Sequence, residues 1–109
     1  MFGMKGMGDM MKLLAQKDKI AANIEAAKQK ARLRTVTADS GAGMVKATAN
    51  GMGEIIRIEY EADAVKDRET LGPLTVSAVN AAIAKSREVM SEEIGQAMGG
   101  IELPPGLFQ

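Results

Sequence analysis

Apolar residues in the first third of the chain recur in alternating steps of three and four. The positions of this seam are Met10, Leu13, Lys17, Ile20, Ile24, Ala27 and Ala31, with Lys17 as the polar break. Such spacing is typical of one face of an α-helix that packs against a partner. Asp9 follows a glycine-rich run and suits an N-cap, which predicts a helix from Asp9 to about Leu33. At ~1.5 Å per residue, this helix is roughly 35 Å long.

The middle of the chain has the pattern of β-strands. Residues 34–38 are rich in β-branched side chains, and residues 44–49 and 54–60 alternate between apolar and polar positions. The expected inward side chains are Val45, Ala47 and Ala49 in one strand and Ile56, Ile58 and Tyr60 in the next. Residues 39–43 have the composition of a turn, and Asn50-Gly51 is a strong hairpin signal. The pattern predicts three antiparallel strands in a meander, with one face covered and one face in water.

A second helix is expected after an acidic connection. Pro73 suits the first turn of a helix, and residues 74–84 carry no charge, which implies burial on most sides. Gly99-Gly100 ends this helix. Pro104-Pro105 cannot continue it, so residues 101–109 are expected to form an extended tail.

Together these elements predict one α+β domain over residues 1–109, with residues 1–8 flexible. Its order is a long helix, a three-stranded antiparallel meander sheet and a second long helix. Strands of about 20 Å cover only part of two helices that are each longer. The uncovered apolar seams need another surface, and a second copy of the chain is the simplest one, which predicts a homodimer. The alternative is a monomer whose shorter helices fold back.

The composition excludes several classes of site. The chain has no Cys and no His, so it lacks disulfides, thiolate metal ligands and the usual general base. We therefore expect no enzyme activity, no metal and no cofactor. Residues 40–43 lack the remaining positions of a phosphate-binding loop, and Glu59, Glu61 and Asp63 are expected to form a solvated acidic edge.

Charge is distributed unevenly along the chain, although the formal net charge is zero. Through Thr35 there are eight basic and three acidic residues, a net charge of +5. The remainder has six basic and eleven acidic residues, a net charge of −5. A basic arm joined to an acidic body indicates a polyanion, or an acidic protein surface, as the partner.

Lys12, Lys19 and Lys30 share one edge of the predicted first helix. On a helical wheel with ~100° per residue and Met10 at zero, these three lysines lie at about 180–200° around the helix axis. Asp18 and Glu25 lie at about 60–80°. A row of ammonium groups suits a phosphate backbone and carries no base information. The candidate DNA-binding residues are Lys5, Lys12, Lys19, Lys30, Arg32 and Arg34. The alternative for each lysine is ordinary solvated surface. Three scattered aromatic rings cannot form the stacking platform that single strands need.

Three blocks of sequence stand out by their order and spacing. They are Met1-Phe2-Gly3 with Gly6, Gly8 and Met11-Lys12; Ser40 to Lys46 with Asn50-Gly51; and Leu103-Pro104-Pro105-Gly106-Leu107. Together they resemble the YbaB/EbfC family of small bacterial nucleoid-associated proteins over nearly the whole chain. Tyr60-Glu61-Ala62 departs from the Asp-Pro that the family often has. Gly72-Pro73 falls where the family tends to continue a helix, so a later start of the second helix is expected here.

The resemblance implies a tweezer-shaped homodimer that binds double-stranded DNA with little sequence preference, as a nucleoid-associated protein of the cytoplasm. The alternative is an adaptor whose basic arm docks on an acidic surface of a replication or recombination protein, without direct DNA contact. No apolar run approaches the ~20 residues of a membrane span, and the start lacks the apolar length of a secretory signal. No membrane partner is therefore expected.

Overall fold

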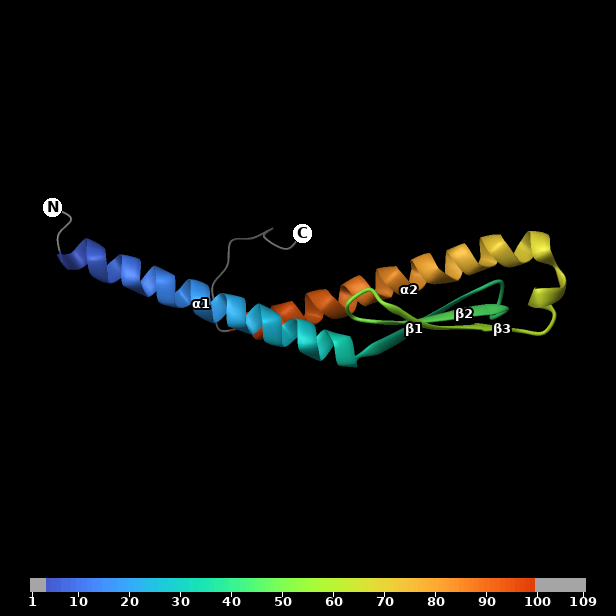
Figure 1. Ribbon diagram of the computed structural model, residues 1–109, viewed down its shortest axis with the longest axis horizontal. Coiled ribbons are helices and arrows are strands. Elements are labelled where there is room, and N and C mark those ends of the chain that lie inside the picture. The colour runs from blue at the N-terminus through green and yellow to red at the C-terminus, as the bar shows by residue number, and fades with distance from the viewer. Residues whose placement is uncertain (1–3, 100–109) are drawn as a thin grey trace.

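The computed structural model of the chain describes residues 4–99, and it describes side chains from Met10 onward. The elements are α1 (Met4–Leu33), β1 (Thr35–Ser40), β2 (Val45–Asn50), β3 (Ile55–Tyr60), a 3₁₀ turn η1 (Ala64–Lys66) and α2 (Arg68–Ala97). The strands form one antiparallel sheet in the order β1-β2-β3. The predicted α+β order of long helix, meander sheet and long helix is confirmed (Figure 1). The tail predicted at residues 101–109 lies outside the described residues.

The two long helices give the molecule an elongated shape, 75 × 23 × 18 Å along its principal axes. α2 lies over one face of the sheet, and its C-terminal part runs antiparallel beside the second half of α1 (Figure 1). The first half of α1 extends beyond the end of α2. The sheet and the start of α1 therefore lie at opposite ends of the molecule.

The core lies between α2 and the inner face of the sheet, and it is built from small side chains. Its buried members are Ala38, Val45, Ala47, Ala49, Ala78 and Ala82. Alanine at the contact lets the helix approach the sheet closely, and the predicted inward positions Val45, Ala47 and Ala49 are confirmed. α2 packs on β1 and β2 and touches β3 little. The inner side of β3 is consequently less covered than the rest of the sheet.

A β-bulge in β3 corrects the predicted inward set. The register slips between Thr48 and Ala49 of β2, which leaves Ile56 as an extra residue in β3. Ile56 is 56% exposed, whereas Ile55 and Ile58 pack against the core. The inward prediction for Ile56 is wrong because a slip of one residue exchanges the faces of a strand.

α2 begins at Arg68, earlier than the start predicted at Pro73. Asp67 is the N-cap, and its carboxylate accepts hydrogen bonds from the backbone N–H of Glu69 (3.1 Å) and of Thr70 (3.3 Å). The Thr70 hydroxyl donates a third bond at 2.5 Å. These bonds satisfy free donors of the first turn. The prediction is wrong because the capping aspartate sets the start, and the helix then continues through the proline.

The pKa of the Asp67 carboxyl is lowered from its ordinary value by these bonds. The Thr70 hydroxyl has the largest effect, followed by the backbone N–H of Thr70, and the backbone N–H of Glu69 contributes less. Because the folded-state pKa lies below the unfolded one, the charge contributes fully to stability above its unfolded pKa near 3.8. That contribution is lost as the pH falls through the lower, folded-state pKa.

Asp67→Asn is expected to lower the melting temperature at neutral pH, because asparagine keeps the cap but not the charge. The gap to the wild type is expected to close as the solution is acidified through the folded-state pKa. Thermal unfolding followed by circular dichroism over a pH series measures this gap. Glu61→Gln, which removes an exposed carboxylate away from the helix start, is the control. A gap that is the same at neutral and strongly acidic pH would contradict the assignment.

α1 begins at Met4, so Asp9 lies inside the helix and is not its N-cap. Gly6 and Gly8 lower the helix propensity of this stretch without ending the helix. Lys5 is therefore part of α1, although its side chain is outside the described ones. Residues 1–3 lie outside the described residues altogether.

Candidate nucleic-acid interface

The N-terminal half of α1 extends free of the other described elements. α2 ends against α1 at Asn23, whose side-chain amide donates to the carbonyl of Ala97 at 3.2 Å. Every side chain described between Met10 and Lys19 is exposed. We call residues 4–19 the arm (Figure 1). Over its described side chains, the arm is accessible to a partner on all sides.

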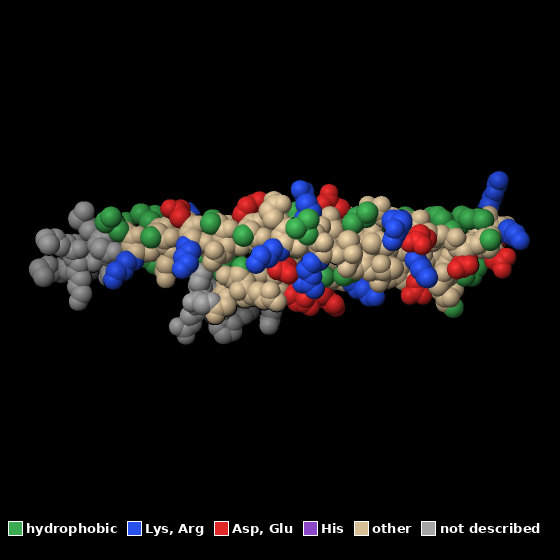
Figure 2. Space-filling model, turned by 90° about the horizontal axis from the view of Figure 1, so that it is seen from below, with side chains coloured by type: hydrophobic (Ala, Val, Ile, Leu, Met, Phe, Trp, Pro, Cys, Tyr) green, Lys and Arg blue, Asp and Glu red, His purple; other side chains and the backbone are tan. Residues whose placement is uncertain are grey.

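Lys12 and Lys19 lie on one edge of the arm, and both side chains are exposed. Lys30 lies on the same edge of α1 but beside α2, where it lines a hollow of about 190 Å³ that Glu93 also lines. Lys5 belongs to this edge by its position in the helix. Figure 2 shows basic side chains spaced along the visible face of the helical end, with a few acidic side chains at its upper edge and more of them toward the middle and the sheet end.

The two arginines of the candidate set are bound within the chain. Arg34 donates to Glu92 at 3.0 Å and to Glu93 at 2.9 Å. Both bonds raise the pKa of Arg34, and the bond to Glu92 has the larger effect. Glu93 is only 8% exposed, so the bond to it is partly buried. Arg32 forms a longer ion pair with Glu54 at 3.5 Å. Sequence reasoning missed these pairs because the carboxylates lie far away along the chain.

The β2–β3 turn is clamped against the end of α1. The backbone N–H of Gly51 donates to the carbonyls of Ala31 (2.9 Å) and Arg34 (3.1 Å), which satisfies acceptors at the helix C-terminus. A Cβ atom on Gly51 would lie 2.6 Å from the Ala31 oxygen and 2.7 Å from Cγ1 of Val89 in α2. The turn predicted at Asn50-Gly51 is therefore confirmed, and it also fixes the direction of α1 relative to the sheet.

A second exposed surface lies where α2 leaves β3 uncovered. Val76, Ile83 and Met90 recur every seven residues along one flank of α2. Val76 is 60% exposed, and the other two line a groove of about 300 Å³ with Met52 of the β2–β3 turn. Tyr60, at the end of β3, is exposed over nearly half of its surface. We call Met52, Tyr60, Val76, Ile83 and Met90 the α2–β3 face.

Other kinds of site find no support in the described part of the chain. Within residues 4–99, among the side chains described from Met10 onward, no three acidic side chains are grouped so that they could hold a metal ion. No helix in the same range has both the length and the apolar character that crossing a bilayer requires.

Comparison with known proteins gives a consistent result. Residues 6–101 match the model of a family described as the YbaB/EbfC DNA-binding family. A nucleoid-associated protein of Moorella thermoacetica is 39% identical over 101 residues, which cover 91% of this chain and 97% of that protein. A nucleoid-associated protein of Pelotomaculum thermopropionicum is 35% identical, covering 93% and 97%. The crystal structure of the uncharacterized protein HP0035 of Helicobacter pylori has a similar fold, with a TM-score of 0.54 at 23% identity over 79% of this chain and 90% of that one.

Proposed function

Because the chain belongs to the YbaB/EbfC DNA-binding family, we propose that it is a nucleoid-associated protein that binds double-stranded DNA as a homodimer with little sequence preference. Membership confirms the resemblance seen in the sequence and agrees with the expectation that the chain is not an enzyme. The observation that carries the proposal is the free arm with Lys12 and Lys19 exposed on one edge. The expected location is the nucleoid, within the cytoplasm.

Lys12, Lys19 and Lys30 make the phosphate contacts in this proposal. At ~1.5 Å per residue, the first and last of them lie roughly 27 Å apart along α1, which corresponds to about eight base pairs of B-DNA. Each ammonium group that meets a phosphate releases condensed counterions, and this release drives binding without any contact to a base. Lys5 extends the same edge toward the start of the helix.

Arg32 and Arg34 have a different role in the proposal. Arg34 already bonds to two carboxylates of α2, so a phosphate would have to displace one of them. Arg32 is paired with Glu54 of the β2–β3 turn. We therefore assign both arginines to holding α1 in place, and the lysine edge to DNA.

The second copy of the chain covers the α2–β3 face. Heptad spacing of Val76, Ile83 and Met90 suits packing against the same flank of another α2. In a two-fold dimer the same surface of each copy packs against its equivalent in the other copy. The partly exposed side chains of the α2–β3 face would therefore bury those of the second copy. The arms lie at the opposite end from the sheet and stay outside such an interface. A dimer thus presents two lysine edges, which doubles the number of phosphate contacts.

Titration with duplexes of unrelated sequence over a series of salt concentrations tests the proposal. We expect equal affinities for all duplexes, weaker binding to single strands, and an affinity that falls steeply with salt. Light scattering is expected to give twice the chain mass of 11.5 kDa. No complex at tens of micromolar protein in low salt would contradict DNA binding. That result would favour the alternative function, an adaptor for replication or recombination proteins. The match to a DNA-binding family does not favour this alternative.

A further inference from the structure

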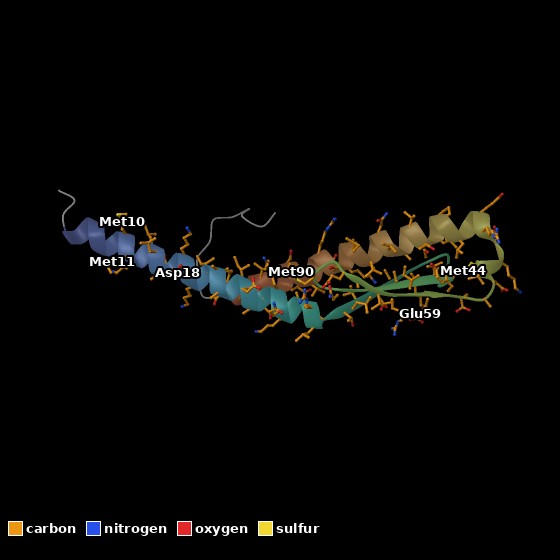
Figure 3. All side chains as sticks on the ribbon, viewed as in Figure 1. Met10, Met11, Asp18, Met44, Glu59 and Met90 are labelled. Atoms are coloured by element: carbon orange, nitrogen blue, oxygen red, sulfur yellow. The ribbon has the colours of Figure 1, made fainter. Side chains whose placement is uncertain are left out.

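The apolar seam of α1 continues onto the arm, past the point where α2 ends. α2 packs against the seam at the buried Ala27 and the half-buried Ile24. On the arm, three apolar side chains of the same side are exposed: Met10 (65%), Leu13 (65%) and Leu14 (59%). We call these three residues the arm strip. Figure 3 shows Met10 projecting from the arm with no other described element beside it.

The chain leaves α2 at the base of this strip. α2 runs antiparallel to α1 and ends at Ala97, which accepts a hydrogen bond from Asn23 (Figure 1). Residues 101–109 follow, outside the described residues, with the sequence Ile-Glu-Leu-Pro-Pro-Gly-Leu-Phe-Gln. Four of these residues are large and apolar: Ile101, Leu103, Leu107 and Phe108. The chain therefore continues from the end of α2 into an apolar segment.

The length of this segment matches the distance from the end of α2 to the far end of the arm strip. From Asn23 back to Met10, α1 rises roughly 20 Å at ~1.5 Å per residue. From Ile101 to Phe108, a chain in the polyproline conformation spans roughly 22 Å at ~3.1 Å per residue. Pro104 and Pro105 fix their own backbone and restrict the residue before them, so ordering the segment costs less entropy than usual.

We propose that residues 101–108 dock along α1 of their own chain from Asn23 toward Met10, with Leu107 and Phe108 covering Met10, Leu13 and Leu14. Charge supports the same register. Glu102 has the one charged side chain of residues 101–109, and Lys17 has the one charged side chain of the seam. Docking places the two close together between α2 and the strip.

The docked segment leaves the lysine edge open. On the helical wheel the arm strip extends from about 300° through zero to about 40°, whereas Lys12 and Lys19 lie at about 180–200°. The segment thus covers apolar surface that would otherwise face water and stiffens the arm, without blocking its basic edge. The inference holds whether or not the chain binds DNA.

A nitroxide label at residue 109 tests the docking. Because the chain has no cysteine, Gln109→Cys gives a single attachment site. In ¹⁵N-labelled protein, we expect the nitroxide to broaden the amide signals of residues 10–14 strongly, and those of the β1–β2 turn at residues 41–43 not at all. The broadening is expected to persist when the labelled protein is mixed with an excess of unlabelled protein, because strip and segment belong to one chain.

Two further variants carry the same label. The double variant Leu103→Ser and Leu107→Ser removes apolar contacts from the segment and is expected to abolish the broadening of residues 10–14. Lys12→Gln changes the opposite edge of the helix and is expected to preserve it. Weak broadening spread evenly over the chain would overturn the proposal. So would broadening of the strip that vanishes on dilution with unlabelled protein, because the strip would then be covered by a second copy.

Discussion

Replacing Lys12, Lys19 and Lys30 with glutamate is expected to weaken binding to any DNA duplex by about a hundredfold or more at moderate salt. In a dimer the three changes remove six proposed phosphate contacts and place repulsive charges along both edges. The slope of log affinity against log salt is expected to become shallower by about 5, because each contact contributes ~0.9. Fluorescence anisotropy with labelled duplexes of unrelated sequence measures both quantities.

A matched variant separates the lysine edge from net charge. Changing Lys46, Lys66 and Arg68 to glutamate alters the charge of the chain equally, but these exposed residues lie on β2, η1 and the start of α2. We expect only a small loss of affinity, through the long-range field. Equal losses in the two variants would mean that overall charge, and not the arm, determines binding. Unchanged affinity in the variant with Lys12, Lys19 and Lys30 replaced would refute the assignment of the three lysines.

Gly51→Ala is expected to destabilise the fold by about 2 kcal/mol and to lower the melting temperature by roughly 10 °C. The added methyl group would meet the backbone oxygen of Ala31 and a methyl group of Val89, both closer than 3 Å. The turn must then move away from α1, which also weakens the two hydrogen bonds from the Gly51 N–H. Denaturant and thermal unfolding measure the loss.

Gly95→Ala is the control for this prediction. Gly95 lies in α2, and a Cβ atom there meets nothing within 4 Å. Alanine in the interior of a helix is favoured over glycine by roughly 0.5–1 kcal/mol, so this variant is expected to be as stable as the wild type or more stable. If both variants lost stability equally, the close approach of the turn to α1 would not be the cause.

The periodicity of the sequence was sufficient for the order of the elements and for most of the core. Steps of three and four located α1, and alternation located Val45, Ala47 and Ala49 on the inner face. Alternation could not reveal the bulge at Ile56, because residues on either side of a bulge keep the same local pattern. At the start of α2, the proline signal indicates the wrong residue, because Asp67 accepts three hydrogen bonds from the first turn and sets the start of the helix.

The candidate interface was only partly predictable for a similar reason. The shared edge of Lys12, Lys19 and Lys30 follows from helical geometry alone, so the wheel was enough to find it. The partners of Arg34 are carboxylates of α2, and their proximity depends on how the two helices pack. The clamp at Gly51 likewise depends on tertiary contact, since Asn-Gly in the sequence indicates a turn but not what the turn touches.

The central claim is that duplex DNA lies along the lysine edge of the arm. An NMR titration of the ¹⁵N-labelled protein with a short duplex tests this most directly, because it locates the contact residue by residue. We expect the largest shift changes at the amides of Lys12 and Lys19 and their neighbours, with little change on the outer face of the sheet. The largest changes at Lys46 and Arg57 of the sheet, with no change along the arm, would contradict the claim.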